Sequence, residues 1–280
     1  MLMNLQNPRA GSSATATQPP AAPQMAVRGT KDFSPGLKIF LRNNIRLILL
    51  REDLECYSRR IAQKVHSAKT PFALVKGLLN AQTGEFRAQY LPPNFDQDPV
   101  SSGQLDTLIA TLVKAEKTTL ANLLRTGLCR ADVMEAVPHL GKLVANVYST
   151  MDPKYKNETE IKINQDAAIT AGAKVRLAYL RYMFNQHRLR QLQNPEQKPP
   201  PVWEMIDADL QVLRRKAPMY QFAFSQLLYE YDHRLWNGLK TIDDEPDNVQ
   251  SLPSEEEIEA RVKLYTTNPS AHEAAKNGTI

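Results

Sequence analysis

Apolar residues recur at three- and four-residue steps along most of this 280-residue chain. That spacing places them on one face of an α-helix, whereas a half-buried strand needs strict alternation of apolar and polar residues. No segment shows the sustained alternation that a sheet requires. The pattern therefore predicts an all-α fold with an irregular body of about 7–8 helices. The expected helices cover about residues 37–67, 70–81, 104–126, 130–136, 138–151, 161–193, 202–216 and 219–237.

Residues that begin or end helices support several of these boundaries. Thr70 and Pro71 are typical of an N-cap and the first helical position, and Gly127 stands where a C-terminal glycine belongs. The prolines between residues 195 and 201 end the long helix before them, because proline cannot continue a helix. The segment 83–103 contains prolines and turn residues, so it predicts an ordered loop with at most a short extended stretch.

Composition divides the chain into an arm, a body and a tail. Residues 1–34 are rich in Ala, Pro, Ser and Thr and carry few large apolar side chains. Burial cannot offset the entropy of ordering such a segment, so this arm is expected to be disordered. Residues 35–240 form the helical body, either as one domain or as two lobes, 35–152 and 153–240. Residues 241–280 form the tail.

The tail is acidic and the rest of the chain is basic. Residues 1–240 carry 32 Lys/Arg and 21 Asp/Glu, a net charge of +11, whereas residues 241–280 carry 3 and 9, a net charge of −6. Ser254 and Glu257 form the pattern of a capping box and predict one short helix in the tail. A basic body with an acidic tail is common among proteins that bind a polyanion, because the tail competes with the polyanion or keeps the body soluble.

The motifs of several function classes are missing from the sequence. The five histidines and two cysteines lack metal-ligand spacing, and the chain has no phosphate-binding glycine loop. We therefore expect no metal, no cofactor and no enzymatic activity, although an active site dispersed over several helices stays open as an alternative. No run of about 18 apolar residues is present, so no membrane span is expected.

Basic and aromatic residues alternate on the expected long helix. Lys174, Arg181 and Arg188 are seven residues apart and form one stripe along it. Cationic groups suit a phosphate backbone, and aromatic rings suit unstacked bases. The alternative is that the stripe is an ordinary solvated face and that the tyrosines belong to the core. The remaining candidate residues for nucleic-acid binding are Arg176, Tyr179, Tyr182, Arg190, Arg214, Arg215 and Lys216.

These features favour a structural RNA-binding protein of nucleocapsid or coat type. Such a protein binds the backbone of single-stranded RNA without reading its sequence, and it self-assembles through its arm and tail. We expect it in the cytoplasm or in a virion; the arm, whose first acidic residue is Asp32, leaves a mitochondrial location as an alternative. The other hypothesis is a helical adaptor, or subunit of a larger complex, that binds its partner through residues 241–280. The layout resembles viral nucleocapsid and coat proteins only in this general sense.

Overall fold

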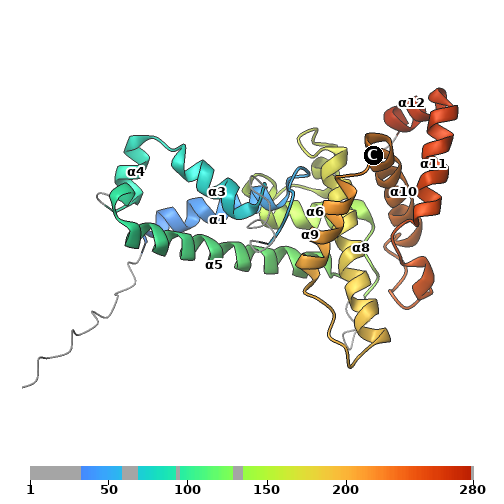
Figure 1. Cartoon of the computed structure of the whole chain (residues 1–280), viewed down its shortest axis with the longest axis horizontal. Coiled ribbons are helices and arrows are strands. Elements are labelled where there is room, and N and C mark those ends of the chain that lie inside the picture. Colours follow the sequence, from blue (N-terminus) through green and yellow to red (C-terminus); the bar gives the residue numbers. More distant parts are fainter. Residues whose placement is uncertain (1–32, 59–68, 93–94, 129–134, 279–280) are drawn as a thin grey trace, which may run out of the picture. The chain divides into compact units, whose positions relative to one another are not determined.

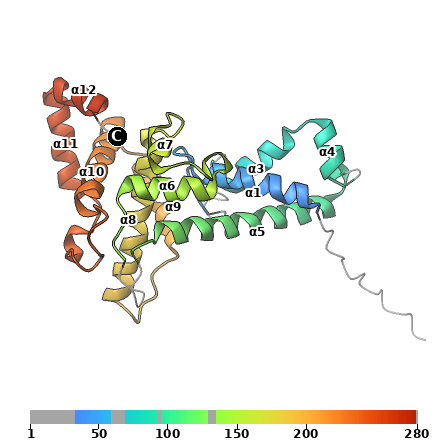
Figure 2. The same ribbon diagram turned by 180° about the vertical axis from the view of Figure 1, so that it is seen from behind.

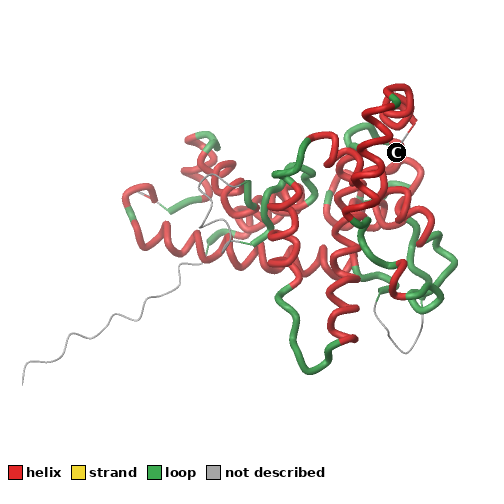
Figure 3. Tube along the Cα trace, turned by 45° about the vertical axis from the view of Figure 1, so that its right-hand side comes forward, coloured by secondary structure: helices red, strands yellow, loops and turns green. Residues whose placement is uncertain are grey.

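The structure is a computed structural model that describes residues 33–58, 69–92, 95–128 and 135–278. All regular secondary structure in these residues is helical, which confirms the all-α class (Figure 3). The expected disorder of the arm and the expected helix at 130–136 lie almost entirely outside the described residues.

The first group of helices packs against the long helix α5. Helices α1 (Pro35–Leu49), α3 (Pro71–Asn80) and α5 (Pro99–Leu124) pack on one another, as Figures 1 and 2 show from opposite sides. Each begins with proline in its first turn, behind a side-chain cap from Ser34, Thr70 and Asp98 respectively. A buried carboxylate ties two of these helices together, because Glu116 of α5 pairs with both Arg42 and Arg46 of α1.

The second group surrounds α8 (Ala171–Gln193). This helix packs against α5, α6 (Leu140–Met151), α9 (Val202–Leu213) and α10 (Pro218–Leu235). Because α8 contacts helices from both sides of Asp152, the two lobes considered above share one core. Residues 32–280 form one compact unit. The short 3-10 helix η2 (Pro153–Tyr155) connects α6 to the segments that follow.

Three boundaries differ from the predictions. The first helix ends at Leu49, and residues 50–58 form turns and irregular loop in place of the expected continuation. The rest of that expected helix, 59–67, lies outside the described residues. The expected loop contains α4 (Gly84–Tyr90), which Thr83 caps, followed by the 3-10 helix η1 (Phe95–Gln97). The expected long helix is broken after α7 (Glu160–Gln165), because the Asp166 carboxylate accepts a hydrogen bond from the backbone of Ala168 and Thr170 caps α8.

The acidic tail is docked on the body of the same chain. After the 3-10 helix η3 (Asp247–Val249), helix α11 (Glu255–Thr267) packs on α10 and buries Ile258 and Tyr265. The capping box of Ser254 and Glu257 is confirmed. A second helix, α12 (Pro269–Gly278), follows it, whereas the sequence predicted one short helix in the tail. The apolar face of the tail helix is therefore already covered within one chain.

A buried ion pair joins α8 to α10. Arg181 and Asp232 are both fully buried, and one guanidinium nitrogen lies 2.5 Å from each carboxylate oxygen. A second guanidinium nitrogen donates to the carbonyl of Pro138 at 2.5 Å, and the guanidinium stacks 4.4 Å from the centre of the Trp236 ring. Removing one partner leaves the other charge buried and unpaired, which is a large energetic cost.

We predict that Arg181→Met lowers the free energy of unfolding by about 3–5 kcal/mol, because Asp232 then stays buried without its partner. Denaturant unfolding followed by circular dichroism measures this change. The matched control is Arg190→Met, an exposed arginine on the same helix, which should change stability by less than about 0.5 kcal/mol. Equal stability of the two variants would contradict the assigned role of the pair.

Candidate nucleic-acid interface

Three of the predicted nucleic-acid contacts are buried. Arg181 is held by Asp232, Tyr179 is 3% exposed and donates to Asp209 at 2.7 Å, and Tyr182 packs its ring on Trp236. The prediction that these three side chains contact nucleic acid is wrong for this fold. A seven-residue spacing identifies one face of a helix, but it does not say whether that face meets solvent or another helix. Charge reversal at Arg181 would therefore report on folding.

The other predicted cations of α8 are mostly engaged with neighbouring acceptors. Lys174 donates to the carbonyl of Asn164 at 3.1 Å, and Arg176 donates to the carbonyl of Glu52. Arg188 donates to the side chains of Asn185 and Gln250. Arg190 is exposed near the end of the helix. The stripe seen in the sequence is thus not a continuous basic surface.

The cluster after α9 is also partly committed. Arg214 donates to the carbonyl of Glu55 at 2.7 Å. Lys216 forms an ion pair of 2.6 Å with Glu255 of the tail helix. Arg215 is exposed. One of the three cations therefore pairs with a carboxylate of the acidic tail. This ion pair contributes to the contact between α11 and the body.

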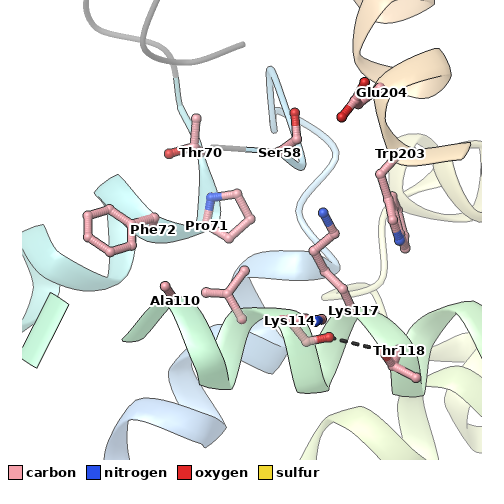
Figure 4. Close-up of a pocket in the computed structure, with 11 residues that line it drawn as sticks. Ser58, Thr70, Pro71, Phe72, Ala110, Lys114, Lys117, Thr118, Trp203 and Glu204 are labelled. Carbon is pink, nitrogen blue, oxygen red and sulfur yellow. Dashed lines mark hydrogen bonds between the residues drawn. The ribbon is translucent and has the colours of Figure 1, made fainter. Parts of the chain in front are cut away.

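A cavity of about 510 Å³ lies between the start of α3, the middle of α5 and the start of α9. Figure 4 shows Lys114 and Lys117 on the α5 side, Trp203 of α9 on one wall, and Pro71 and Phe72 of α3 on the opposite wall. Lysines beside aromatic and apolar walls suit a ligand that combines an anion with a flat ring. None of these residues belongs to a local sequence pattern that predicts a binding site.

Lys117 is the most perturbed cation of the cavity. Its ammonium group donates to the carbonyl of Tyr57 at 2.8 Å and lies 4.8 Å from the centre of the Trp203 ring. Burial lowers the pKa of Lys117 to about 8, against the opposing effect of the Asp207 and Glu204 carboxyls. A nearby anion would recover part of this energetic cost, because it favours the charged form of the lysine.

Asp207 holds the segment that closes the back of the cavity. Its carboxylate is fully buried and accepts hydrogen bonds from the backbone of Tyr57 at 2.5 Å and of Ser58 at 2.8 Å. Burial raises the pKa of Asp207, and these hydrogen bonds oppose the rise. The loop that carries Tyr57 is thereby fixed to α9, next to Trp203.

Cations and aromatic rings continue from the cavity toward the end of α8. The Trp203 ring contacts the Phe184 ring edge-on at 5.3 Å, and the Arg125 guanidinium lies 4.9 Å from the centre of the Phe184 ring. Burial lowers the pKa of His187, a hydrogen bond with the backbone of Pro200 opposes this, and the charges of Arg125 and Arg190 lower the pKa further. We call Lys114, Lys117, Arg125 and Arg190 the basic strip.

The spacing of residues along α5 indicates part of this strip. Lys114, Thr118 and Arg125 are four and eleven residues apart, so they lie within about 40° of one another around α5. This face is inconspicuous in the sequence because the helix carries no run of adjacent basic residues. The contribution of Trp203 and Arg190 comes from tertiary packing and has no local signal.

Two classes of site are not found in the part of the chain that the structure describes. Its His, Cys, Asp and Glu side chains form no cluster of three that could hold a metal ion. No helix in the described ranges is both long and apolar enough to cross a membrane. Searches of protein-family models, of curated proteins and of solved structures gave no match to this chain. Its function must therefore be argued from the site.

We predict that Lys117 loses its proton near pH 8, about 2 units below an ordinary lysine, because burial disfavours its charged form. The measurement is the rate at which an amine-reactive ester labels the peptide containing Lys117, followed from pH 6 to 11 by mass spectrometry. The same peptide in denatured protein is the control, and its rate should rise only at higher pH. Coincident pH profiles for folded and denatured protein would refute the prediction.

The lowered pKa of Lys117 also makes the stability of the fold depend on pH. A lysine whose folded pKa lies below its unfolded pKa opposes folding while it is charged. This cost is fully present below about pH 8 and disappears as the pH rises toward the unfolded value. The stability of the wild type relative to Lys117→Met should therefore increase between about pH 8 and pH 10.5. A constant difference across this window would contradict the shift.

Proposed function

We propose that this chain is a structural RNA-binding protein of the nucleocapsid or coat type, which binds the backbone of single-stranded RNA without reading its sequence. The observation that carries the proposal is the basic strip, in which cations alternate with the Trp203 and Phe184 rings. Binding of single strands commonly combines a positively charged groove with aromatic stacking platforms. The net charge of +11 over residues 1–240 adds a general attraction for a polyanion.

The dimensions of the strip suit an extended strand. Lys114 and Arg125 are eleven residues apart on one helix, which is about 16 Å along the axis. Arg190, near the end of α8, contacts the sulfur of Met205 of α9 through one guanidinium nitrogen at 3.9 Å. Cations spaced in this way can meet phosphates of one strand that are separated by intervening nucleotides, and they carry no information about base identity.

The docked tail changes the expectation for self-assembly. Helix α11 buries Ile258 and Tyr265 against its own body, and Glu255 pairs with Lys216 of that body. In this arrangement the apolar face of α11 is unavailable to a second subunit. Assembly through the tail then requires α11 to undock, and assembly through the arm involves residues outside the described ranges. The same packing leaves the adaptor hypothesis without an apolar docking face on α11.

We predict that the double variant Lys114→Glu/Arg125→Glu binds single-stranded RNA at least about tenfold more weakly than the wild type, because two phosphate contacts become repulsive. The plot of log affinity against log salt should become shallower by about 1.4 for the two lost contacts. Fluorescence anisotropy with a labelled oligouridine at several salt concentrations measures both quantities.

The matched control is Lys156→Glu/Lys162→Glu, which changes the net charge equally at two exposed positions away from the strip. This control separates the general effect of charge from contact with the strip. If both double variants lose affinity equally, attraction is diffuse and the strip is not the binding surface. Wild-type protein that shows no salt-sensitive RNA binding would overturn the proposed function itself.

A further inference from the structure

We propose that the cavity between α3, α5 and α9 is a slot for a single unstacked nucleobase, which places its ring against Trp203 and its phosphate on Lys114 and Lys117. This inference rests on the proposed function and adds the chemical class of the group that the cavity binds. The same chemistry occurs in a free nucleotide and in one base turned out of an RNA strand, and the experiment below distinguishes the two.

The walls of the cavity are aromatic and apolar on two sides. Trp203 stands on one side, with Phe72 and Pro71 on the other, as Figure 4 shows. Trp203 is supported from behind, because its ring packs on Tyr57 at 5.0 Å and on Phe184 at 5.3 Å. Its neighbours hold the indole in one orientation. Stacking a base on it therefore costs little conformational entropy in the protein. Aromatic stacking of this kind contributes about 1–3 kcal/mol per base.

Positive groups stand where a phosphate would lie. Lys114 is exposed beside the cavity. Lys117 holds its ammonium group over the Trp203 ring and donates to the carbonyl of Tyr57, so a base that stacks on this ring takes the place of the ammonium group, which then turns to the phosphate. The N-terminus of α3 also borders the cavity, capped by Thr70, and the helix dipole places partial positive charge there. An anion next to the ring would thus meet two lysines and a helix terminus, and it would also meet the opposing charge of the Glu204 carboxylate, which lines the cavity beside Trp203.

The polar side chains that line the cavity, besides its lysines, are Ser58, Thr70, Thr118 and Glu204. The Thr118 hydroxyl donates to the carbonyl of Lys114 at 3.0 Å, and the Thr70 hydroxyl accepts from the backbone of Ala73 at 3.1 Å (Figure 4). Both hydroxyls therefore already make hydrogen bonds within the protein. Stacking is sequence-tolerant because every base has a π face. The slot is therefore consistent with binding that does not read sequence.

Trp203 also supplies the readout. The chain has two tryptophans, and Trp236 is 1% exposed and packed on Arg181, so a base that enters the cavity can contact Trp203 only. We would titrate the protein with a nine-residue oligouridine, with the abasic sugar-phosphate strand of equal length, and with uridine monophosphate. Tryptophan fluorescence reports stacking, and anisotropy of labelled strands reports binding.

Oligouridine should quench the fluorescence of the wild type saturably, and Trp203→Phe should abolish the quenching while retaining the packing on Tyr57 and Phe184. The abasic strand should bind through the basic strip about tenfold more weakly, without quenching, because the stacking contribution is lost. Ala110→Leu, which fills the cavity, should remove the quenching by oligouridine. Thr111→Leu is the matched control on the exposed neighbouring position and should behave as the wild type.

The outcomes separate the slot from the proposed function. Equal binding of oligouridine and the abasic strand without quenching would overturn the slot and leave the basic strip intact. Absence of binding by both strands and by the nucleotide would overturn both. Quenching by uridine monophosphate but not by oligouridine would support a nucleobase slot for free nucleotides. It would overturn the proposal that the cavity binds a base of an RNA strand.

Discussion

The fold depends on one buried ion pair, between Arg181 of α8 and Asp232 of α10. The pair is fully buried, and the same guanidinium donates to the carbonyl of Pro138 ahead of α6, so three segments meet at one cation. Two desolvated charges are stable only when their geometry is good. Here both terminal guanidinium nitrogens have acceptors, whereas the buried Nε of Arg181 has none. The requirement for good geometry fixes how α8 lies against α10, and α10 in turn carries the acidic tail helix α11.

Fixing α8 also fixes the basic strip. Phe184 lies three residues beyond Arg181 on α8, and its ring contacts both Trp203 of α9 and the Arg125 guanidinium at the end of α5. Asp207 adds a second tie, because it anchors the loop at Tyr57 to α9 beside the cavity. The exposed cations of the strip are therefore mounted on helices whose positions the core determines. A rigid mounting lowers the cost of ordering the site when a strand binds.

Sequence patterning predicts the helices of this chain well and their surroundings poorly. Helical spacing indicated the segment around Arg181, and the composition suggested a solvated basic stripe. Asp232, the partner of Arg181, lies 51 residues later in the sequence, so no local pattern predicts the pairing. Helix α4 was missed because neighbouring prolines outweighed the cap from Thr83. The cavity escaped prediction because Pro71, Lys117 and Trp203 become neighbours only after folding.

The central claim is that single-stranded RNA lies along the basic strip, and the most direct measurement is to map the contact. Photocrosslinking of 4-thiouridine RNA to the full-length chain, followed by mass spectrometry of the peptides, identifies which residues lie beside the strand. The account predicts crosslinks at Trp203 and in the half of α5 that contains Lys114 and Lys117. Crosslinks confined to α10 and α11, or spread evenly over the surface, would contradict it.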